Sequence, residues 1–412
     1  MLSRGDNIKS IEERLLSDDL IFNCKNIKKI DFYIENNDEP LIHHAKLIYE
    51  KYEAFKNQEV IEIKGNYTNA KIFTKNVEQA VIDQLQTIVD SPYAKDTKIR
   101  VMPDAHSGFG VPIGYTQNLN DKVVPNFVGV DIGCGMLVSK LANYSDYPVN
   151  FFRLEKVITE NVPSGFNVFN EKQVLQLNLE DLIAEINLDR AYKSVGTLGG
   201  GNHFIELNQS EKGLYLVIHS GSRHLGVEVC NYWQKRIDNN LGYLTGSDFN
   251  GYLNDMKIAQ EFASLNRKRM RDTIFNKMKW DLLDEFETVH NYIDLEHMIL
   301  RKGAISARKD EKVIIPINMR DGSLIAKGLG NSDWNYSAPH GAGRIMSRTE
   351  AKQRLDIKEF KDTMKDVWSN SVSKKTLDES PFVYKDINEI INNTKDTILI
   401  IEKLKVLYNY KA

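Results

Sequence analysis

Apolar and polar positions alternate most clearly in residues 196–226, GTLGGGNHFIELNQSEKGLYLVIHSGSRHLG. A glycine-rich segment in this stretch ends in Asn202 and His203. The pattern then predicts two strands, at residues 204–207 and 214–218, which are joined by a polar turn. We interpret the rest of the chain around this predicted hairpin.

The register of the hairpin decides how its histidines lie. If Leu207 pairs with Tyr215, then His203 and His219 stand directly opposite each other, with Cβ atoms roughly 4.5–5.5 Å apart. Two imidazoles at that separation can share one cation. A register shifted by one residue would turn one ring to the other face of the sheet. The hairpin is therefore a candidate metal site that depends on its pairing.

Hydrophobic periodicity along the remaining chain predicts both strands and helices. Further strands are predicted at residues 60–64, 71–74, 99–102, 123–130, 136–141, 312–316 and 323–327, with a glycine-rich loop at 103–116. Helices are predicted at residues 41–55, 77–89, 150–161, 170–192, 227–240, 249–298, 350–369 and 385–408, with a loop at 336–348. Because no repeat or clean linker divides the sequence, we expect an α+β fold. It consists of one large domain, residues 66–412, and a small N-terminal extension of unknown role, residues 1–65.

Composition narrows the classes of protein that the chain can represent. Cys24, Cys134 and Cys230 are too few and too scattered among 412 residues for a disulfide framework, which favours a reducing, cytoplasmic setting. The charged N-terminus does not resemble a signal peptide, and no apolar run is long enough to span a bilayer. A formal charge of −3 argues against a basic coat for non-specific nucleic-acid binding, but it allows a local basic cleft.

Candidate metal ligands combine one carboxylate, one thiol and three imidazoles. They are Asp131, Cys134, His203, His219 and His290. This set suits Zn, Mn, Fe or Co and disfavours Mg and Ca, which prefer oxygen ligands. Five ligands exceed the needs of one tetrahedral zinc, and two cations sharing the thiolate would suit phosphoryl chemistry. Each histidine taken alone is more often structural, and the spacing matches no standard zinc motif.

His340 is a candidate for direct chemistry. Pro339 stiffens the chain before it, and the glycines that follow remove side-chain cover, so the imidazole should be accessible. An accessible imidazole can act as a general base, a metal ligand or a nucleophile that attacks a nucleotide α-phosphate. The plainer interpretation is a helix-capping or merely exposed histidine.

Arginines beside these segments are candidates for binding phosphate. Arg344 and Arg348 lie one helical turn apart, and Arg223 follows the predicted hairpin. The guanidinium group matches phosphate oxygens in a bidentate manner. The alternative for each is an ordinary surface ion pair.

Taken together and in order, the motifs of this chain resemble the RtcB RNA ligases. The matching segments are MPDAHSGFGVPIG, VGVDIGCGM, GTLGGGNHFIE, HSGSRHLG, His290-Asn291, RKGAISAR, APHGAGRIMSR and the terminal Lys411. The resemblance extends from about residue 66 to residue 412, and it implies an RtcB-like domain with β-sheets, flanking helices and a central metal pocket. It also implies an RNA ligase that uses GTP and manganese.

The resemblance implies a role for each matching residue. Asp131, Cys134, His203, His219 and His290 are expected to bind two Mn²⁺ ions, with Cys134 bridging them, and His340 is expected to become guanylylated. Asn202, Glu206, Asn291, Ser323 and Lys411 match positions around the guanylate. Arg223 and Arg344 match positions that hold phosphates.

In this family, a 2′,3′-cyclic phosphate end of RNA is opened to a 3′-phosphate. GMP then passes from the histidine to that phosphate, and a 5′-hydroxyl end displaces it. The implied partners are RNA molecules with such ends and an archease-like activator, with no membrane. The physiological RNA and the oligomeric state are not implied.

One loop departs from the family pattern. Where the family reads close to IPGSMG, this chain has the sequence IPINMRDG at residues 315–322. Smaller differences are Gly133 before the candidate cysteine and Ala412 at the end of the chain. The changed loop motivates an alternative function, a metal-dependent phosphoesterase that opens cyclic phosphates without ligation. A non-catalytic module that binds metal or RNA is a third alternative.

Overall fold

The computed structural model describes residues 60–142, 149–237 and 240–411. Residues Glu59–Ala412 form one compact unit. Ile61–Lys64 lie near the end of the extension predicted at residues 1–65, but they pair with the strand Asn69–Ile72 and therefore belong to this unit. The helix predicted at residues 41–55 lies outside the described residues. In the part of the chain that is described, no helix is long and apolar enough to cross a membrane.

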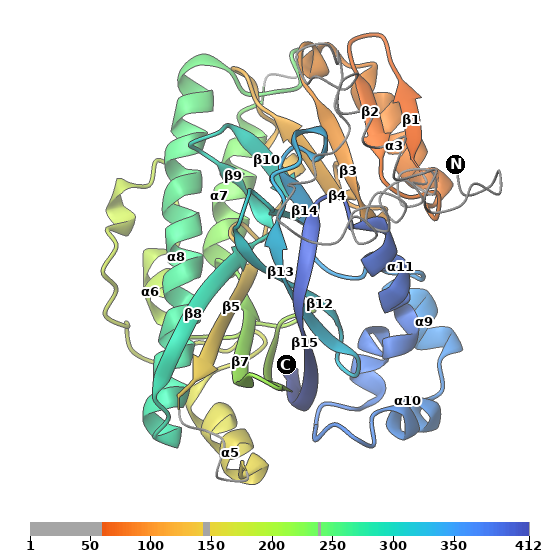
Figure 1. Ribbon diagram of the computed structural model, residues 1–412. Coiled ribbons are helices and arrows are strands. Elements are labelled where there is room, and N and C mark those ends of the chain that lie inside the picture. The colour runs from red at the N-terminus through yellow and green to blue at the C-terminus, as the bar shows by residue number, and fades with distance from the viewer. Residues whose placement is uncertain (1–59, 143–148, 238–239, 412) are drawn as a thin grey trace, which may run out of the picture. The chain divides into compact units, whose positions relative to one another are not determined.

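Two large β-sheets and a short two-stranded sheet confirm the α+β prediction (Figure 1). The six-stranded sheet has the order β1 (Ile61–Lys64), β2 (Asn69–Ile72), β3 (Ile99–His106), β4 (Ile113–Asn118), β10 (Ile299–Lys302) and β9 (Asn291–Asp294). The seven-stranded sheet has the order β12 (Lys312–Asn318), β13 (Gly322–Gly328), β15 (Ile398–Lys411), β6 (Phe204–Ser210), β7 (Gly213–Ser220), β5 (Gly135–Leu141) and β8 (Leu282–Val289). The strands β11 (Ala304–Ser306) and β14 (Ser337–Pro339) form the third sheet.

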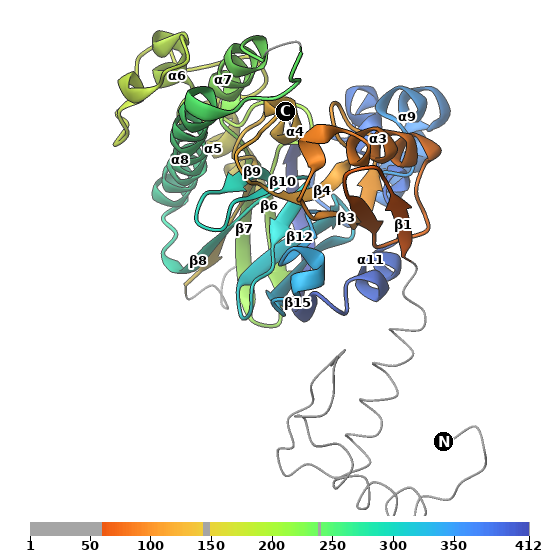
Figure 2. The ribbon, with the colours of Figure 1, turned by 90° about the horizontal axis from the view of Figure 1, so that it is seen from above.

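α-Helices flank these sheets. They are α3 (Gln79–Val89), α4 (Pro125–Val128), α5 (Phe151–Asn161), α6 (Leu188–Ser194), α7 (Arg223–Lys235), α8 (Gly246–Met278), α9 (Arg348–Arg354), α10 (Ile357–Thr363) and α11 (Ile387–Asn393). Figure 2 shows α6, α7 and α8 on one side of the unit and α9 and α11 on the other. The long helix α8 packs across β5 and β7, and therefore supports the strands that carry the candidate ligands.

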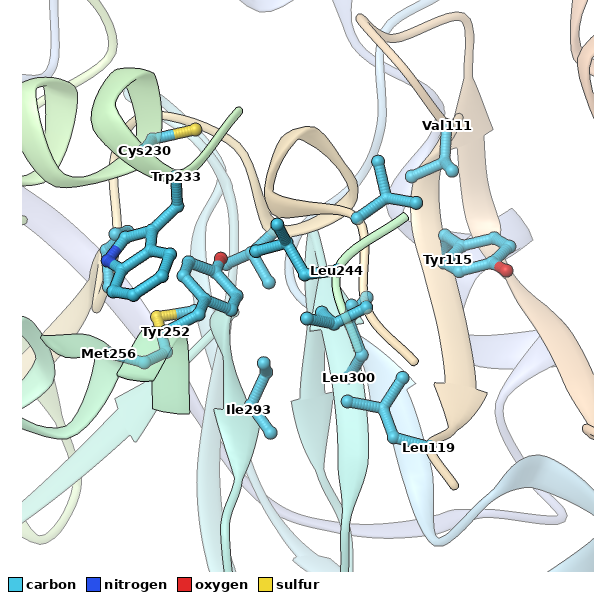
Figure 3. Packing of buried hydrophobic residues seen from close by; sticks show 14 of the residues in the cluster. Val111, Tyr115, Leu119, Cys230, Trp233, Leu244, Tyr252, Met256, Ile293 and Leu300 are labelled. Atoms are coloured by element: carbon cyan, nitrogen blue, oxygen red, sulfur yellow. The ribbon is translucent and has the colours of Figure 1, made fainter. Parts of the chain in front are cut away.

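The largest core lies between α7, α8 and the six-stranded sheet. Trp233 of α7 packs beside Tyr252 and Met256 of α8, and these residues face Ile293 and Leu300 of strands β9 and β10 (Figure 3). All five side chains are almost completely buried. Burying large apolar side chains in this way is the main favourable contribution to folding.

The predicted hairpin is present as β6 and β7, but its register is shifted by one residue. Leu207 lies opposite Leu216, not Tyr215, and His219 lies opposite Phe204, not His203. The strands extend beyond the prediction to a two-residue turn between Ser210 and Gly213, and turn length sets the register of a hairpin. The predicted pairing of His203 with His219 is therefore wrong.

Two predictions around residues 123–192 are also wrong. The strand predicted at 123–130 is instead the short helix α4, because Pro125 occupies its first turn and Gly129, with φ of 92°, ends it. The helix predicted at 170–192 is reduced to a 3₁₀ turn at Leu179–Asp181 and to α6. Asn178 and Asn187 accept backbone N–H groups at the starts of these two elements and so begin new turns.

Three long helix predictions end early. Helix α8 stops at Lys279, which is left-handed, and residues 282–294 form β8 and β9, so His290 and His297 share no helix. The predicted 385–408 helix contains α11 but then becomes β15, which is hydrogen-bonded on both sides by β13 and β6. Asp356 caps α10 and divides the predicted 350–369 helix in two. The loop predicted at 103–116 contains the end of β3 and the start of β4.

The remaining predictions agree with the structure within a few residues. These are the strands near the N-terminal edge, those at 99–102, 136–141, 312–316 and 323–327, and the helices at 77–89, 150–161 and 227–240. Residues 340–347 form a loop that enters α9, as predicted, after the short strand β14. Local periodicity was therefore sufficient wherever the segment was short and clearly amphipathic.

A buried arginine of α8 holds together the backbone next to the candidate ligands. Arg267 is fully buried, and its Nη1 donates to the carbonyl oxygens of Gly133, at 2.7 Å, and Ser220. Its Nε lies 2.7 Å from Glu287 Oε1. This side chain therefore joins α8 to the turn before β5, to the end of β7 and to β8.

We expect Arg267→Met to lower the free energy of unfolding by about 3–5 kcal/mol, because it leaves Glu287 and two carbonyl groups without their partner. Chemical denaturation against wild type measures this difference. Lys268→Met, at the exposed neighbouring position, is the matched control and should change stability by about 0.5 kcal/mol or less. Equal stabilities of the two variants would contradict the assignment.

Candidate metal centre

Strand pairing brings three of the candidate ligands to one place. Strand β5 lies between β7 and β8, with Met136 opposite His219 and Gly135 opposite Val289. Cys134 and His290 are the next residues along their strands, and the His290 N–H donates to the Cys134 carbonyl oxygen at 2.9 Å. The ends of three neighbouring strands therefore carry a thiol and two imidazoles.

Asp131 and His203 reach the same place from loops. The Cys134 N–H donates to the Asp131 carbonyl oxygen at 3.2 Å, across a turn in which Gly133 has φ of 69°. This turn lets carboxylate and thiol converge. His203 precedes β6, so the alternation of side chains along the strand does not fix its ring. The two histidines meet despite the shifted register for this reason.

The five ligand atoms form a row. His203 Nε2 lies 3.0 Å from Asp131 Oδ2 and 3.5 Å from Cys134 Sγ. Cys134 Sγ lies 3.2 Å from His219 Nε2, which in turn lies 3.3 Å from His290 Nε2. Ligand atoms of Cys134, His203 and His219 all lie within 4.8 Å of one another. The predicted set therefore converges, with the sulfur at the middle of the row.

Backbone carbonyl groups orient two of the imidazoles toward this row. His203 Nδ1 lies 2.9 Å from the Leu198 carbonyl oxygen, and His219 Nδ1 lies 3.2 Å from that of Asn202. A carbonyl oxygen only accepts, so the hydrogen of each neutral ring is on Nδ1 and the lone pair is on Nε2. Metal-binding histidines in proteins commonly have this arrangement. Lone pairs that converge in this way fit a bound cation.

Burial sets the protonation of the row. Burial, together with the neighbouring His203 and His340, holds the pKa values of His219 and His290 well below the usual range. Burial and then Asp131 raise the pKa of the Cys134 thiol well above its usual value. Burial would raise the pKa of Asp131, but His203 lowers it to about 2. Two neutral imidazoles and a carboxylate can therefore bind a metal directly, and the thiol would release its proton to do so.

His340 stands next to this row, on the chain between β14 and α9. Its ring centroid lies 4.8 Å from that of His290. The fully buried Asp104 of β3 holds it, because Oδ2 accepts the His340 backbone N–H at 3.1 Å and lies 2.6 Å from Nδ1. Gly343 is required for this approach, since a Cβ there would lie 2.4 Å from the Asp104 carbonyl oxygen. Nε2 of His340 is thus the nitrogen left for chemistry.

A cavity of about 340 Å³ opens beside His340 and the candidate metal ligands. Its wall includes most of the predicted site, namely Asp131, Cys134, Asn202, Glu206, His219, His290, Asn291, His340, Arg344 and Lys411. His203 belongs to the ligand row but does not line the cavity.

Two other predicted residues do not line the cavity wall. Arg223 donates to the Gly165 carbonyl oxygen at 3.0 Å and to Thr197 Oγ1 at 3.1 Å. Ser323 is buried in β13, where its Oγ has no partner among the described residues.

The sequence did not single out two buried carboxylates at this site. Asp104 lies inside MPDAHSGFGVPIG, so the motif contained a signal for it. Glu379 had no such signal, because residues 374–383 showed no recognisable pattern. Its carboxylate lies 2.6 Å from Lys411 Nζ and 2.7 Å from Arg348 Nη1.

The fold and the site together define a class of protein. It is an α+β protein in which a cysteine, histidines and an aspartate converge beside a cavity that contains a further, carboxylate-held histidine. A family model described as tRNA-splicing ligase RtcB matches residues 84–187 and 176–412.

The chain is also similar to individual proteins with related names. It is 32% identical to the RNA-splicing ligase RtcB of Escherichia coli K12, over 81% of this chain and 95% of that protein. It is 24% identical to the tRNA-splicing ligase RtcB of Nanoarchaeum equitans, over 80% of this chain and 91% of that protein. The chain therefore belongs to the RtcB family.

We expect Mn²⁺ to stabilise the protein against thermal unfolding, since a ligand bound only to the folded state at 100 times its Kd adds about 2.7 kcal/mol. Cys134→Ala should remove this stabilisation. Cys230→Ala is the matched control, because Cys230 is also buried and free but lies away from the row. If Cys134→Ala retained the full metal-induced shift in Tm, the ligand assignment would be wrong.

Glu206 should make stability depend on pH. Burial raises its pKa from 4.5 to about 7, although Asn409 and Asn208 donate hydrogen bonds to its carboxylate. Between these pH values the unfolded chain loses the proton and the folded protein keeps it, so the free energy of unfolding falls as pH rises.

Glu206→Gln should remove this fall, which is on the order of 3 kcal/mol or less. Denaturation of both proteins between pH 4.5 and 7.5 measures it, with the exposed turn variant Glu211→Gln as the control. Parallel pH profiles for wild type and Glu206→Gln would contradict the expectation.

Proposed function

We propose that this protein is a GTP- and Mn²⁺-dependent RNA ligase that acts through a guanylylated His340. It joins RNA ends carrying a 3′-phosphate or a 2′,3′-cyclic phosphate to 5′-hydroxyl ends. One observation carries the proposal: the His340 imidazole, held at Nδ1 by a buried carboxylate, lies beside His290 of the ligand row. The names of its relatives, RNA-splicing and tRNA-splicing ligases, support the same reaction class.

The geometry around His340 suits nucleophilic attack on GTP. Asp104 keeps the hydrogen on Nδ1, so the Nε2 lone pair can attack the α-phosphorus. An N–P bond forms, the P–O bond to pyrophosphate breaks, and GMP remains on the histidine. Two Mn²⁺ ions held by Asp131, Cys134, His203, His219 and His290 would neutralise phosphate charge at this step. Asp104 also stabilises the positive charge that develops on the ring.

Charged side chains in the cavity suit guanine better than adenine. Guanine presents an acceptor at O6 and donors at N1 and N2 on one edge. The Glu206 carboxylate can accept from such donors, and the Lys411 ammonium can donate to such an acceptor. Both residues lie on paired strands, because Asn409 of β15 is opposite Glu206 and Lys411 is opposite Phe204. Asn202 and Asn291 add amide groups to the same wall.

RNA ends would follow GTP into the site. Water opens the cyclic phosphate by breaking its bond to the 2′-oxygen, which leaves a 3′-phosphate and a 2′-hydroxyl. An oxygen of that phosphate takes GMP from His340, and the 5′-hydroxyl oxygen then displaces GMP from the activated end and loses its proton to solvent. Arg344 lines the cavity where phosphates would lie, whereas Arg223 would have to act from outside it. Ser323 would contribute only from behind the wall.

The free Cys134 and Cys230 fit a reducing, cytoplasmic setting, which is part of the proposal. An archease-like activator protein is included among the proposed partners.

The loop at residues 315–322 supports a second candidate function. Pro316, Ile317, Asn318 and Met319 line the cavity, so the loop contacts whatever occupies it. Hydrogen bonds from Arg320 to Asp321 and to Thr363 of α10, both at 2.7 Å, hold the loop in place. If this loop keeps the nucleotide out, the protein would open cyclic phosphates as a metal-dependent phosphoesterase without joining ends.

Incubation with α-labelled GTP and Mn²⁺ should attach label to the wild-type protein and none to His340→Ala. The labelling rate of Asp104→Asn should be at least about 10²-fold lower than that of wild type, because this variant loses the anion that orients and stabilises the imidazole. His297→Ala is the control and should label normally, because His297 is an exposed histidine between β9 and β10. Undiminished labelling of His340→Ala would disprove the assignment of the nucleophile.

RNA products from the same reactions separate the two functions. The ligase joins ends only when GTP is present, and the phosphoesterase yields 3′-phosphate ends whether or not GTP is added.

A further inference from the structure

Glu379 is the most heavily engaged carboxylate at the wall of the cavity. Its side chain is 3% exposed, and it accepts hydrogen bonds from Lys411 Nζ at 2.6 Å, Arg348 Nη1 at 2.7 Å and the Tyr384 hydroxyl at 2.8 Å. The Arg344 guanidinium lies 3.6 Å away. Every one of these partners also lines the cavity. One buried acid therefore contacts the cationic part of the wall as a whole.

The carboxylate is ionised in this setting. Burial would raise its pKa, but Lys411 and Arg348 lower the pKa of Glu379 to about 2. A buried carboxylate with several charged donors is energetically acceptable. Two of these donors also have other acceptors: Arg344 donates to the Asp378 carbonyl oxygen at 2.7 Å, and Arg348 donates to the Asp378 carboxylate at 2.6 Å.

Lys411 depends on Glu379 more than the other partners do. The backbone of Lys411 is fixed, because its N–H donates to Ser371 Oγ at 2.8 Å and the Ser371 hydroxyl donates to its carbonyl oxygen at 3.0 Å. Its side chain lies with Nζ 5.7 Å from the centre of the Phe204 ring. Glu379 accepts a hydrogen bond from one N–H of the ammonium group and so fixes the direction of that group. The remaining hydrogens are left for another acceptor.

We propose that Glu379 is a positioning residue that fixes the Lys411 ammonium for recognition of guanine, and so sets the preference for GTP over ATP. This inference rests on the proposed function, in which Lys411 donates to guanine O6. Adenine carries an amino group where guanine carries O6, so a firmly placed donor rejects it. A donor that can swing away loses this discrimination along with affinity.

Asp378 provides a matched control one residue away. It is also buried, and it contacts Arg348 Nη1 at 2.6 Å and Lys352 Nζ at 3.2 Å. No ion pair joins it to Lys411 among the described residues. Both acids therefore form an ion pair with Arg348, but of the two only Glu379 forms one with Lys411.

Binding of GTP and ATP, measured by calorimetry in the His340→Ala background, tests the proposal without turnover. Glu379→Gln should weaken GTP binding by about tenfold, the equivalent of one lost charge-assisted hydrogen bond, and ATP binding much less. The ratio of the two affinities should fall to a similar extent. In Asp378→Asn, the ratio of GTP affinity to ATP affinity should stay within about twofold of the ratio in the His340→Ala protein. An unchanged ratio in Glu379→Gln would overturn the proposal.

A double-mutant cycle separates positioning from a general structural effect. If Glu379 acts through Lys411, the double variant Glu379→Gln/Lys411→Ala should have the same ratio of GTP affinity to ATP affinity as Lys411→Ala alone. Additive losses would overturn the proposal. Glu379→Asp, which keeps the charge but is shorter by one methylene, gives the same test if the glutamine variant does not fold.

Kinetics of labelling in proteins that retain His340 provide a second readout. Glu379→Gln should raise the KM for GTP with a smaller change in kcat, because the nucleophile and the metal ligands are untouched. If wild type takes no label from any nucleotide, the proposed function fails. If wild type takes label and Glu379→Gln keeps the GTP preference, only the role of Glu379 fails.

Discussion

The site depends on the convergence of lone pairs around the Cys134 sulfur. The hydrogen-bonded ends of β7, β5 and β8 bring this thiol to His219 and His290, and the turn and loop beside them add Asp131 and His203. Carbonyl groups hold the Nδ1 hydrogens of two rings, so their Nε2 lone pairs face the Cys134 thiol and the Asp131 carboxylate. A cation that displaced the thiol proton would engage the sulfur, the carboxylate and the imidazole lone pairs together. The fold thus assembles a set of groups that fits a metal.

Two buried carboxylates fix the side chains that lie between the ligand row and the cavity. Asp104 of β3 holds His340, and Glu379 holds Lys411 of β15, so each acid and its partner come from different parts of the chain. Burying a carboxylate costs several kcal/mol unless donors surround it. The donors here are the same groups that face the cavity. Stability of the fold and placement of the reactive groups therefore share the same contacts.

Local patterns predicted what local interactions determine. The strands at 312–316 and 323–327 were correct, because their alternation is confined to a hairpin. The strands β8 and β15 were mistaken for helix, because they form strands by pairing with β5, β6 and β13, which lie far away in the sequence. Motif resemblance predicted the five residues that converge around the Cys134 sulfur. It missed Glu379, because a single acid at the end of a short 3₁₀ helix has no spacing by which to recognise it.

The histidine pair was predicted for the wrong reason, and the reason it still forms is instructive. Opposed positions in the hairpin would place both rings on one face, but the true register pairs His219 with Phe204. His203 instead follows the turn containing Gly199 and Gly201, whose φ values are 88° and 73°, and so escapes strand alternation. Ligands at strand ends are directed by turns, where glycine frees the backbone. A register error therefore did not displace the site.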